Sequence, residues 1–454
     1  MTFRIVFIAA CILVSGCAKT IPLTTEQFHH SLNVQVDGKP WFKATNPKKD
    51  NEIIEDFGEQ LRVINNYKEY QTKDQVLIFV HGGLNRLGAN QSRTTETIEA
   101  INSWNDTIGG TSGKTIYPVM INWHSRGWTW YDRMFRVRKG RINPTAAIVT
   151  SPFAILTDAG RTIGRLPAVY YDETTSMLSN TTHLGRKVNH PPSDWEDMEN
   201  IHIEDRRESY TERWQYGLFQ IFPGVLRSVT IPIADFALYE SYQMMLRRID
   251  MLFRTEEDYD NAAKQKKTDN EGAIPRLMEM LIKDKKEIVL IGHSMGAIVV
   301  NEIVRRYPQA NFTTIVYMAG ACTTKDFLDT IPSYLENRNN DTKFYNLTLH
   351  PFADQDESTG FYLFPNGSLL EWLDTYVHRV KTPLDLTFGK WNNAVNVLPL
   401  LGSLPAHVKK RIFVKGFPFE ENGFPVLHGD FGRFPYWDPD FWDPKYKKPF
   451  KPYR

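Results

Sequence analysis

The stretch that decides the fold is Ile288-Val289-Leu290-Ile291-Gly292-His293-Ser294-Met295-Gly296-Ala297. Its first four residues, 288–291, are a short β-prone apolar run, and a helical pattern follows the turn over residues 297–307. The Gly-x-Ser-x-Gly turn between them needs glycines, because its backbone is strained and neighbouring elements approach closely. A Gly-rich phosphate loop or a plain connector is the alternative, but no lysine follows in the P-loop pattern. We therefore predict that Ser294 is a nucleophile, with its hydroxyl above the sheet beside a helix N-terminus that favours negative charge.

Strands and helices alternate on both sides of this turn. The predicted strands are 76–80, 116–123, 288–291, 314–318, 344–349 and 411–414, and the predicted helices are 92–104, 275–283, 297–307 and 369–380. This rhythm predicts an α/β fold with a doubly wound, mainly parallel sheet, whose core spans residues 71–123 and 271–433. Residues 124–270 lack the rhythm, and we predict that they form a large, mostly helical insertion or cap.

The N-terminus has the form of a bacterial lipoprotein signal over residues 1–16. Arg4 precedes an apolar run, residues 5–13, that is too short to span a bilayer as a helix. The small residues directly before Cys17 resemble the bacterial lipobox, so we expect cleavage before Cys17 and its lipidation; an ordinary secretory signal with a chance cysteine is the alternative. Acyl chains on Cys17 would tether the protein to a membrane of the cell envelope. In a Gram-negative cell we expect the outer membrane, on its periplasmic or surface face.

Two further segments flank the predicted core. Residues 17–70 are polar and mixed, and we interpret them as a spacer and lead-in. Residues 434–454 are rich in proline and aromatic residues, and we expect this tail to wrap the surface in extended form. Of the three cysteines, only Cys322 remains free after processing, so no internal disulfide is expected.

The composition of the 454 residues excludes several classes of protein. The 54 Lys and Arg residues nearly balance 53 Asp and Glu, and the net charge of +1 argues against a nucleic-acid binder. A hydrophobic share of 41% argues against disorder, and a mean hydropathy of -0.41 argues against a polytopic membrane protein. The twelve histidines show no His-Glu-x-x-His pattern and the cysteine pairs of a zinc site are absent, so we expect no metal and no organic cofactor.

With these motifs the sequence resembles the α/β-hydrolase superfamily, particularly its lipase-like and esterase-like members. The resemblance covers residues 76–123 and 274–430, and it is carried by Phe79-Val80-His81-Gly82-Gly83, by the Gly-x-Ser-x-Gly turn and by a late histidine. It implies a Ser–acid–His triad in that chain order. The sequence departs from the commonest family layout, because its large insertion comes before the nucleophile.

The resemblance also implies an oxyanion hole built from two backbone N–H groups. One comes from the residue after the nucleophile, Met295. The other comes from the loop after the strand that ends in His-Gly, at Gly83 or Leu84. Two such donors stabilise the negative oxygen of a tetrahedral intermediate.

The general base of the triad is expected after the acid, in a loop beyond the last predicted strand. His428 stands there, next to a glycine, and is our candidate. His407 precedes that strand and His378 lies in a predicted helix, so neither fits. His81 and His293 are interpreted as structural histidines.

The acid is expected in the loop after the predicted strand 344–349. The candidates in that loop are Asp354 first, then Asp356 and Glu357. The carboxylate would hold the imidazole in the correct tautomer and stabilise the imidazolium. The two carboxylates not used would be ordinary solvated residues of an acidic turn.

These residues predict a membrane-anchored serine hydrolase that cleaves carboxylic esters, including lipid acyl esters, through an acyl-enzyme. Two alternatives stay open from sequence alone. An acyltransferase would use the same triad and pass the acyl group to another alcohol instead of water, and a cell-envelope binding protein would use the hydrolase fold without catalysis. The expected partners are a small-molecule or lipid ester and the membrane, without nucleic acid; the oligomeric state is not predicted.

Overall fold

The computed structural model of the chain describes residues 23–454 with gaps. The gaps are residues 36–37, 39, 46–52, 55, 74, 84–86, 109–113, 126–155, 158, 172–187, 197–198, 204–238, 240, 256–271, 338–340, 358–366, 378–381 and 420–421. The predicted signal with Cys17 lies outside the described residues, and so do Leu84, His378 and most of the predicted insertion. In the part of the chain that is described, no helix has both the length and the apolar character to cross a membrane.

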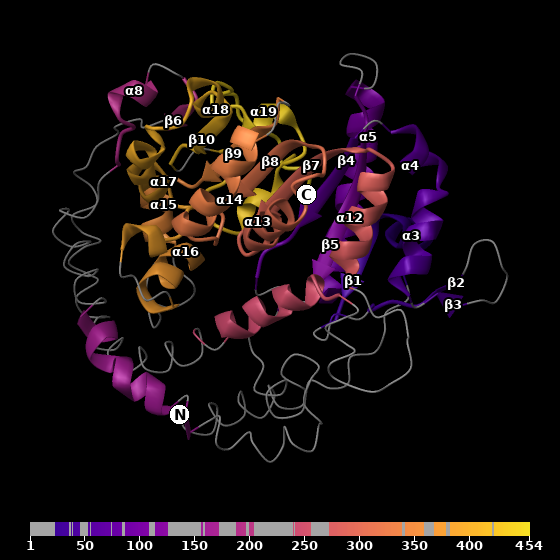
Figure 1. Cartoon of the computed structure of the whole chain (residues 1–454), viewed down its shortest axis with the longest axis horizontal. Coiled ribbons are helices and arrows are strands. Elements are labelled where there is room, and N and C mark those ends of the chain that lie inside the picture. Colours follow the sequence, from indigo (N-terminus) through magenta and orange to yellow (C-terminus); the bar gives the residue numbers. More distant parts are fainter. Residues whose placement is uncertain are drawn as a thin grey trace.

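Eight strands form one sheet in which all neighbouring pairs are parallel (Figure 1). In spatial order they are β1 (Ser31–Val34), β5 (Ile116–Trp123), β4 (Gln75–Val80), β7 (Glu287–His293), β8 (Phe312–Met318), β9 (Lys343–Thr348), β10 (Ile412–Gly416) and β6 (Ile201–Ile203). Helices flank this sheet, so the predicted α/β class with a parallel sheet is confirmed. A separate antiparallel pair consists of β2 (Ala44–Thr45) and β3 (Ile53–Ile54).

The helices vary from single turns to six turns. Those with defined bounds are α2 (Thr25–His30), α3 (Phe57–Asn65), α4 (Lys68–Thr72), α5 (Leu87–Ile108), α8 (Ser193–Glu196), α12 (Ala273–Lys283), α13 (Gly296–Arg306), α14 (Thr324–Asn337), α15 (Pro351–Asp356), α16 (Leu369–Trp372), η2 (Leu373–Val377), η3 (Pro383–Asp385), α17 (Trp391–Val397), η4 (Leu398–Leu401), α18 (Ala406–Lys409), η5 (Asp430–Arg433) and α19 (Pro439–Trp442). The helices predicted at 92–104, 275–283 and 297–307 are confirmed as α5, α12 and α13.

Both edge strands of the sheet come from outside the predicted core. β1 comes from the segment interpreted as a spacer, and β6 comes from the segment interpreted as an insertion. Each is short and interrupted by polar residues, so neither shows the apolar run by which the central strands are recognised. β1 is held by its ladder with β5 and by the buried pair in which the Asn122 amide donates to the Asn33 side-chain oxygen over 2.9 Å.

The direction of the chain across the sheet reverses between β4 and β7. α5 connects β4 to β5 in one direction, and α13 connects β7 to β8 in the other. Because parallel crossovers are right-handed, these two helices lie on opposite faces of the sheet. Ligands of such sheets bind beyond the carboxyl ends of the strands at this switch point. A ligand is therefore expected to bind at the loops after Val80 and His293.

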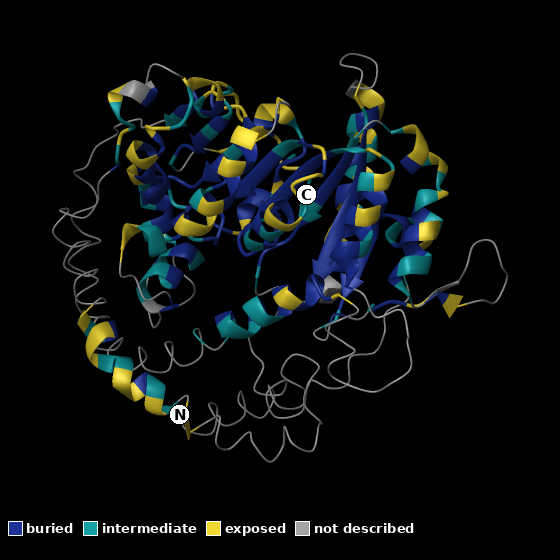
Figure 2. Ribbon diagram, in the orientation of Figure 1, coloured by how far each residue is buried: buried dark blue, intermediate teal, exposed yellow. Residues whose placement is uncertain are grey.

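The central strands form the core of the molecule. All eight residues of β5 are buried, and so are Ile288 to Gly292 of β7. Figure 2 shows the sheet as a buried layer whose flanking helices carry the exposed residues on their outer sides. Each fully buried Ile, Leu or Val side chain contributes roughly 1.5–3 kcal/mol relative to an exposed one. In β4 only Gln75 and Phe79 are incompletely buried.

The two glycines of the Gly-x-Ser-x-Gly turn are required by close approach of backbone. A Cβ atom at Gly296 would lie 2.1 Å from the carbonyl oxygen of Val80, and one at Gly292 would lie 2.6 Å from the carbonyl oxygen of Gly296. The first turn of α13 therefore packs directly against β4, and the end of β7 packs against the start of α13. The steric reason for glycine at both positions, predicted from the sequence, is confirmed.

We expect Gly296→Ala to lower the free energy of unfolding by about 3 kcal/mol, because the added methyl group meets backbone that cannot rotate away. Urea denaturation of the purified protein measures this. Gly164→Ala is the matched control, since its Cβ meets nothing within 4 Å. On an exposed helical position that change should be neutral or slightly stabilising. Equal stabilities for the two variants would contradict the packing of α13 on β4.

The C-terminal tail is more buried than predicted. Six of its aromatic side chains are at most 8% exposed, namely Phe434, Tyr436, Trp437, Phe441, Trp442 and Phe450. The tail therefore anchors itself through these buried side chains, and the short helix α19 interrupts the predicted extended backbone. The physical reason is the large apolar area of so many aromatic rings, which is favourable to bury. The chain ends over the middle of the sheet in the view of Figure 1.

Candidate active site

Ser294 lies at the switch point in a strained backbone conformation. Its φ is 54°, a left-handed value uncommon for a residue other than glycine. Its N–H donates to the Met318 carbonyl over 2.9 Å, and its carbonyl accepts from Ala297 and Ala321 over 3.0 and 2.9 Å. The side chain is 1% exposed, and its hydroxyl has no hydrogen-bond partner. A buried hydroxyl held in strain and left without a partner indicates a functional rather than a structural role.

The loop after β4 packs directly on this turn. A Cβ atom at Gly82 would lie 2.7 Å from the Cβ of Ser294, and one at Gly83 would lie 2.9 Å from the sulfur of Met295. The structure thus brings together Gly83 and Met295, the two residues predicted to donate to an oxyanion. Met295 is the N-cap of α13, where backbone N–H groups lack partners within the helix.

His81 has the contacts of a structural residue. Its Nε2 accepts from the Trp123 backbone N–H over 3.1 Å and lies 2.8 Å from the Asn90 amide nitrogen. The protonated nitrogen is therefore Nδ1, which donates to the Gly82 carbonyl over 2.7 Å. Burial lowers the pKa of His81 to about 4, so the ring is neutral and holds the Gly82 loop against β5.

His428 is brought to the same place by the loop after β10. His293 Nε2 donates to the His428 carbonyl over 2.9 Å, and the centroids of the two rings are 5.2 Å apart. Both ring nitrogens of His428 are buried without a hydrogen-bond partner. Burial, with a smaller effect of His293, lowers the pKa of His428 to about 3. The imidazole is therefore neutral and its lone pair is available to accept a proton. His407, which the sequence analysis rejects as the general base, lies on α18.

Among the three acid candidates, Glu357 is the one in contact with His428. Glu357 follows α15 directly, and its Oε2 accepts the backbone N–H of His428 over 2.8 Å. Burial raises the pKa of Glu357, which the His428 N–H partly opposes. The contact is with the His428 backbone, and no hydrogen bond joins the Glu357 carboxylate to the His428 ring.

Asp354 lies on α15 and is 2% exposed, but it does not line the cavity that contains Ser294 and His428. Neither of its carboxylate oxygens makes a well-formed hydrogen bond. Burial raises the pKa of Asp354 to about 7, although the nearby Ser368 hydroxyl and the Lys390 ammonium favour the ionised form. Asp356 is exposed on the same helix. The first two acid candidates are thus placed away from the cavity.

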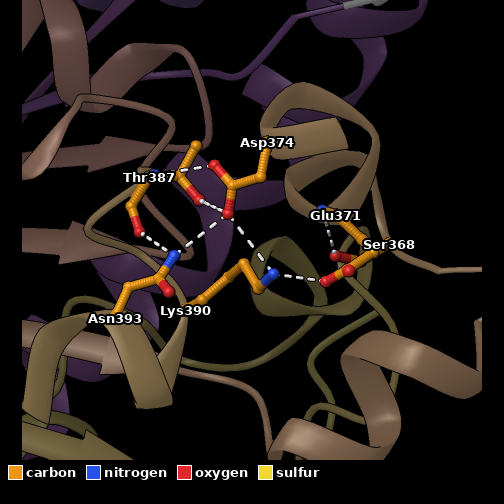
Figure 3. Close-up of polar contacts among 6 residues, drawn as sticks. All are labelled: Ser368, Glu371, Asp374, Thr387, Lys390 and Asn393. Atoms are coloured by element: carbon orange, nitrogen blue, oxygen red, sulfur yellow. Dashed lines mark hydrogen bonds and ion pairs between the residues drawn. The ribbon is translucent and has the colours of Figure 1, made fainter. Parts of the chain in front are cut away.

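Lys390 is the centre of a partly buried ionic network next to Asp354 (Figure 3). Its ammonium pairs with Glu371 and, over 3.3 Å, with Asp374. Asp374 also accepts the Thr387 N–H over 2.8 Å and the Asn393 amide over 3.0 Å. Burial alone would lower the pKa of Lys390, but the two carboxylates raise it, so the ammonium stays charged. Removing one partner would lower the free energy of unfolding, because it leaves the opposite charge partly buried with one partner fewer.

This network anchors α16 and thereby shapes the cavity. Glu371 lies on α16, and the same helix carries Leu369 and Trp372 to the cavity wall. Lys390 comes from the residue before α17, so the network joins two helices that are separate in the sequence. The network positions the apolar side of the candidate site and contacts none of its reacting groups.

The cavity has a volume of about 320 Å³ and a mixed lining. The apolar and aromatic residues of the lining are Phe79, Met120, Leu369, Trp372 and Tyr436, and its polar residues are Asn90, Arg93, Thr94, Thr97, Asn122, Tyr453 and Arg454. Ser294, His293, His428 and Glu357 also line it. The sequence analysis does not predict these polar residues. The only signal for them is the spacing of polar residues at 90, 93, 94 and 97, which places those four on one face of α5.

Within the described residues, no three His, Cys, Asp or Glu side chains come together in a way that could hold a metal ion. Cys322 is a buried free thiol. Comparisons of the chain with protein-family models, with curated proteins and with solved structures each found no match.

Proposed function

We propose that the protein is a serine hydrolase that cleaves carboxylic esters, on a fold of the α/β-hydrolase type. One observation carries this proposal: the strained Ser294 has a buried hydroxyl without a partner, in the same cavity as a neutral His428 whose ring nitrogens are also without partners. Unpaired buried polar groups are costly, so two of them facing one cavity at the switch point of the sheet favour a catalytic role. The lipid anchor at Cys17 is part of the proposal and lies outside the described residues.

In the proposed reaction His428 takes the proton of Ser294 Oγ as that oxygen attacks the acyl carbonyl. The backbone N–H groups of Gly83 and Met295 donate to the resulting oxyanion. His428 then protonates the leaving alcohol, and water attacks the acyl-enzyme to release the acid and restore Ser294. Ser294 and His428 make no hydrogen bond to each other here, so substrate binding must bring their reacting atoms to about 3 Å.

We assign the acid of this triad to Glu357 rather than to Asp354, the first candidate from the sequence. Glu357 contacts His428 and lines the cavity, whereas Asp354 does neither. The negative charge of Glu357 would stabilise the imidazolium that forms when His428 takes the serine proton.

The test of this proposal is covalent labelling. A protein lacking residues 1–17 should react with a fluorophosphonate, and peptide mass spectrometry should place the adduct on Ser294. The same protein should hydrolyse p-nitrophenyl butyrate. Absence of labelling under conditions that label an ordinary esterase would overturn the hydrolase assignment and favour a binding protein.

The pH dependence of kcat/KM should differ from that of an ordinary histidine base. Because burial lowers the pKa of His428 to about 3, the free base stays neutral well below pH 6.5. Glu357 must stay ionised, and burial raises its pKa above the ordinary 4.5. We therefore expect activity to rise with pH as Glu357 ionises, with no limb from the titration of His428 near the ordinary histidine value of 6.5. A pH series on a neutral ester measures this, and a limb centred near pH 7 would contradict it.

A further inference from the structure

Two buried asparagines line the cavity that contains Ser294. Asn90 comes from α5 and is 3% exposed, and Asn122 comes from β5 and is 4% exposed. Thr94 of α5 connects them, because its hydroxyl donates to the backbone carbonyl of Asn90 over 2.8 Å and accepts from the Asn122 amide over 3.0 Å. The side chains of Asn90, Thr94 and Asn122, which we call the amide cluster, are thus connected, buried and uncharged.

The amide cluster lies beside the loop that packs on Ser294. The Asn90 amide nitrogen lies 2.8 Å from His81 Nε2, and His81 directly precedes Gly82. A Cβ atom at Gly82 would lie 2.7 Å from the Cβ of Ser294. Asn90 is therefore joined to the nucleophile through one histidine and one glycine, so a ligand that contacts both the cluster and Ser294 need not be large.

Neighbouring groups fix the orientation of both amides. His81 Nε2 accepts the Trp123 N–H and is therefore unprotonated, so the Asn90 amide must direct its nitrogen, and not its oxygen, at the ring. The Thr94 hydroxyl gives its one proton to the Asn90 backbone carbonyl, so the Asn122 amide must direct its nitrogen at that hydroxyl. In both side chains the oxygen, Oδ1, therefore points away from these partners.

The two amide oxygens are acceptors without a donor. Within the described part of the chain, no N–H or O–H donates to Oδ1 of Asn90 or of Asn122. Neither oxygen is sealed in the interior, unlike Asn33 Nδ2, which is buried without a partner beside Asn122. Since both asparagines line the cavity and are otherwise buried, each oxygen is placed to accept a hydrogen bond from a molecule in the cavity.

We propose, on the basis of the hydrolase function above, that Asn90 and Asn122 select esters that carry neutral hydroxyl groups. A hydroxyl supplies the proton that each amide oxygen lacks and brings no charge into the cavity. An ammonium group would need a carboxylate partner. Glu357 is the one carboxylate among the described residues that line the cavity, and it already accepts the His428 N–H. A volume of about 320 Å³ suits a small hydroxylated ester.

Two pairs of substrates test the preference and show which half of the ester carries the hydroxyl groups. For the alcohol half, glycerol monobutyrate is compared with propyl butyrate, which has the same carbon skeleton. For the acyl half, ethyl β-hydroxybutyrate is compared with ethyl butyrate. Each ratio of kcat/KM is corrected for the rates of alkaline hydrolysis of the two esters. We expect a ratio of at least about 10-fold in one pair, because leaving a desolvated acceptor unpaired costs about 5- to 150-fold.

Variants connect the preference to the two amides. Asn90→Ala and Asn122→Ala should each lower the ratio about 5-fold, and the double variant should bring it close to one. Both esters are measured on the same preparation, so the ratio does not depend on the folded fraction. The matched control is Asn105→Ala on α5, a buried asparagine outside the cavity whose amide is paired at both ends with the Ile116 backbone. It should leave the ratio unchanged. No preference in either pair, or a preference that survives the double variant, overturns the hydroxyl site.

Binding distinguishes failure of the hydroxyl site from failure of the hydrolase proposal. Calorimetric titration of Ser294→Ala with both pairs should show about 10-fold tighter binding of the hydroxylated ester in one pair, and the difference should be lost when Asn90→Ala and Asn122→Ala are added. Asparagine-dependent binding without hydrolysis by the wild type would support the hydroxyl site and overturn the hydrolase. Hydrolysis and labelling at Ser294 with equal kcat/KM within both pairs would support the hydrolase and overturn the hydroxyl site.

Discussion

Ser294→Ala should reduce kcat for ester hydrolysis by roughly 10⁴- to 10⁶-fold, which is the loss expected when a covalent nucleophile is removed. The reason is that the serine hydroxyl is the group that attacks the carbonyl and forms the acyl-enzyme. The residual rate would come from the oxyanion donors at Gly83 and Met295 and from substrate binding. Steady-state kinetics with p-nitrophenyl butyrate measure kcat, and fluorophosphonate labelling should be abolished in parallel.

The same substitution should leave the protein folded and equally or more stable. Alanine at a φ of 54° is strained about as much as serine, and the change removes a buried hydroxyl without a partner. We expect the free energy of unfolding to stay the same or rise by about 1 kcal/mol. Ser103→Ala, at an exposed position on α5, is the control and should change neither activity nor stability. A Ser294→Ala protein with more than a tenth of the wild-type rate would exclude Ser294 as the nucleophile.

The part of the fold that could be predicted from sequence is the part whose strands are buried on both faces. Val76 to Val80 and Ile288 to Ile291 are continuous apolar runs, and their positions are confirmed in β4 and β7. β1 and β6 could not be predicted in this way, because an edge strand needs few apolar residues and is held largely by ladder hydrogen bonds to one neighbour. The burial of the tail could not be predicted either, because a Pro-rich composition indicates extended backbone but does not say which aromatic side chains are buried.

The residues of the candidate site also fall into those that sequence could place and those that it could not. Ser294, Met295 and Gly83 could be placed from sequence because they directly follow two central strands, and their positions depend only on local geometry. Arg454 could not be placed, because it reaches the cavity through tertiary contacts of Tyr453 with Gly432 and Thr97. No spacing in the sequence encodes such a contact.

A small structural difference, which the sequence does not reveal, decides which of the acid candidates lies beside His428. Asp354 and Glu357 are three residues apart in one acidic loop. α15 ends at Asp356, so Asp354 stays on the helix and faces the start of α16, where the Ser368 N–H donates to its carbonyl over 2.6 Å. Glu357 leaves the helix with a non-helical backbone, and its carboxylate reaches the His428 backbone N–H. The exact residue at which a short helix ends decides which carboxylate lies beside the histidine, and this boundary is the least predictable property of an element.

Glu357→Gln should therefore lower kcat by about 10³- to 10⁴-fold, whereas Asp354→Asn should change it by less than 10-fold. The glutamine oxygen can still accept the His428 N–H, so the loop stays in place while the charge that stabilises the imidazolium is lost. Kinetics on a neutral ester measure both variants under the same conditions. The reverse ranking, with Asp354→Asn inactive and Glu357→Gln active, would return the role of the acid to Asp354.

A stability measurement tests the position of Asp354 independently of activity. Its pKa is raised in the folded state from 3.8 to about 7, so its contribution to stability is present at low pH and is lost as pH rises through about 7. Between pH 5 and pH 7 this loss amounts to roughly 2–3 kcal/mol of unfolding free energy. Asp354→Asn, which cannot ionise, should remove that loss and make the protein relatively more stable at pH 8 than the wild type.

Asp356→Asn, an exposed change on the same helix, should leave the pH dependence unaltered. An unchanged pH dependence in Asp354→Asn would show that this carboxyl is not buried as the structure places it.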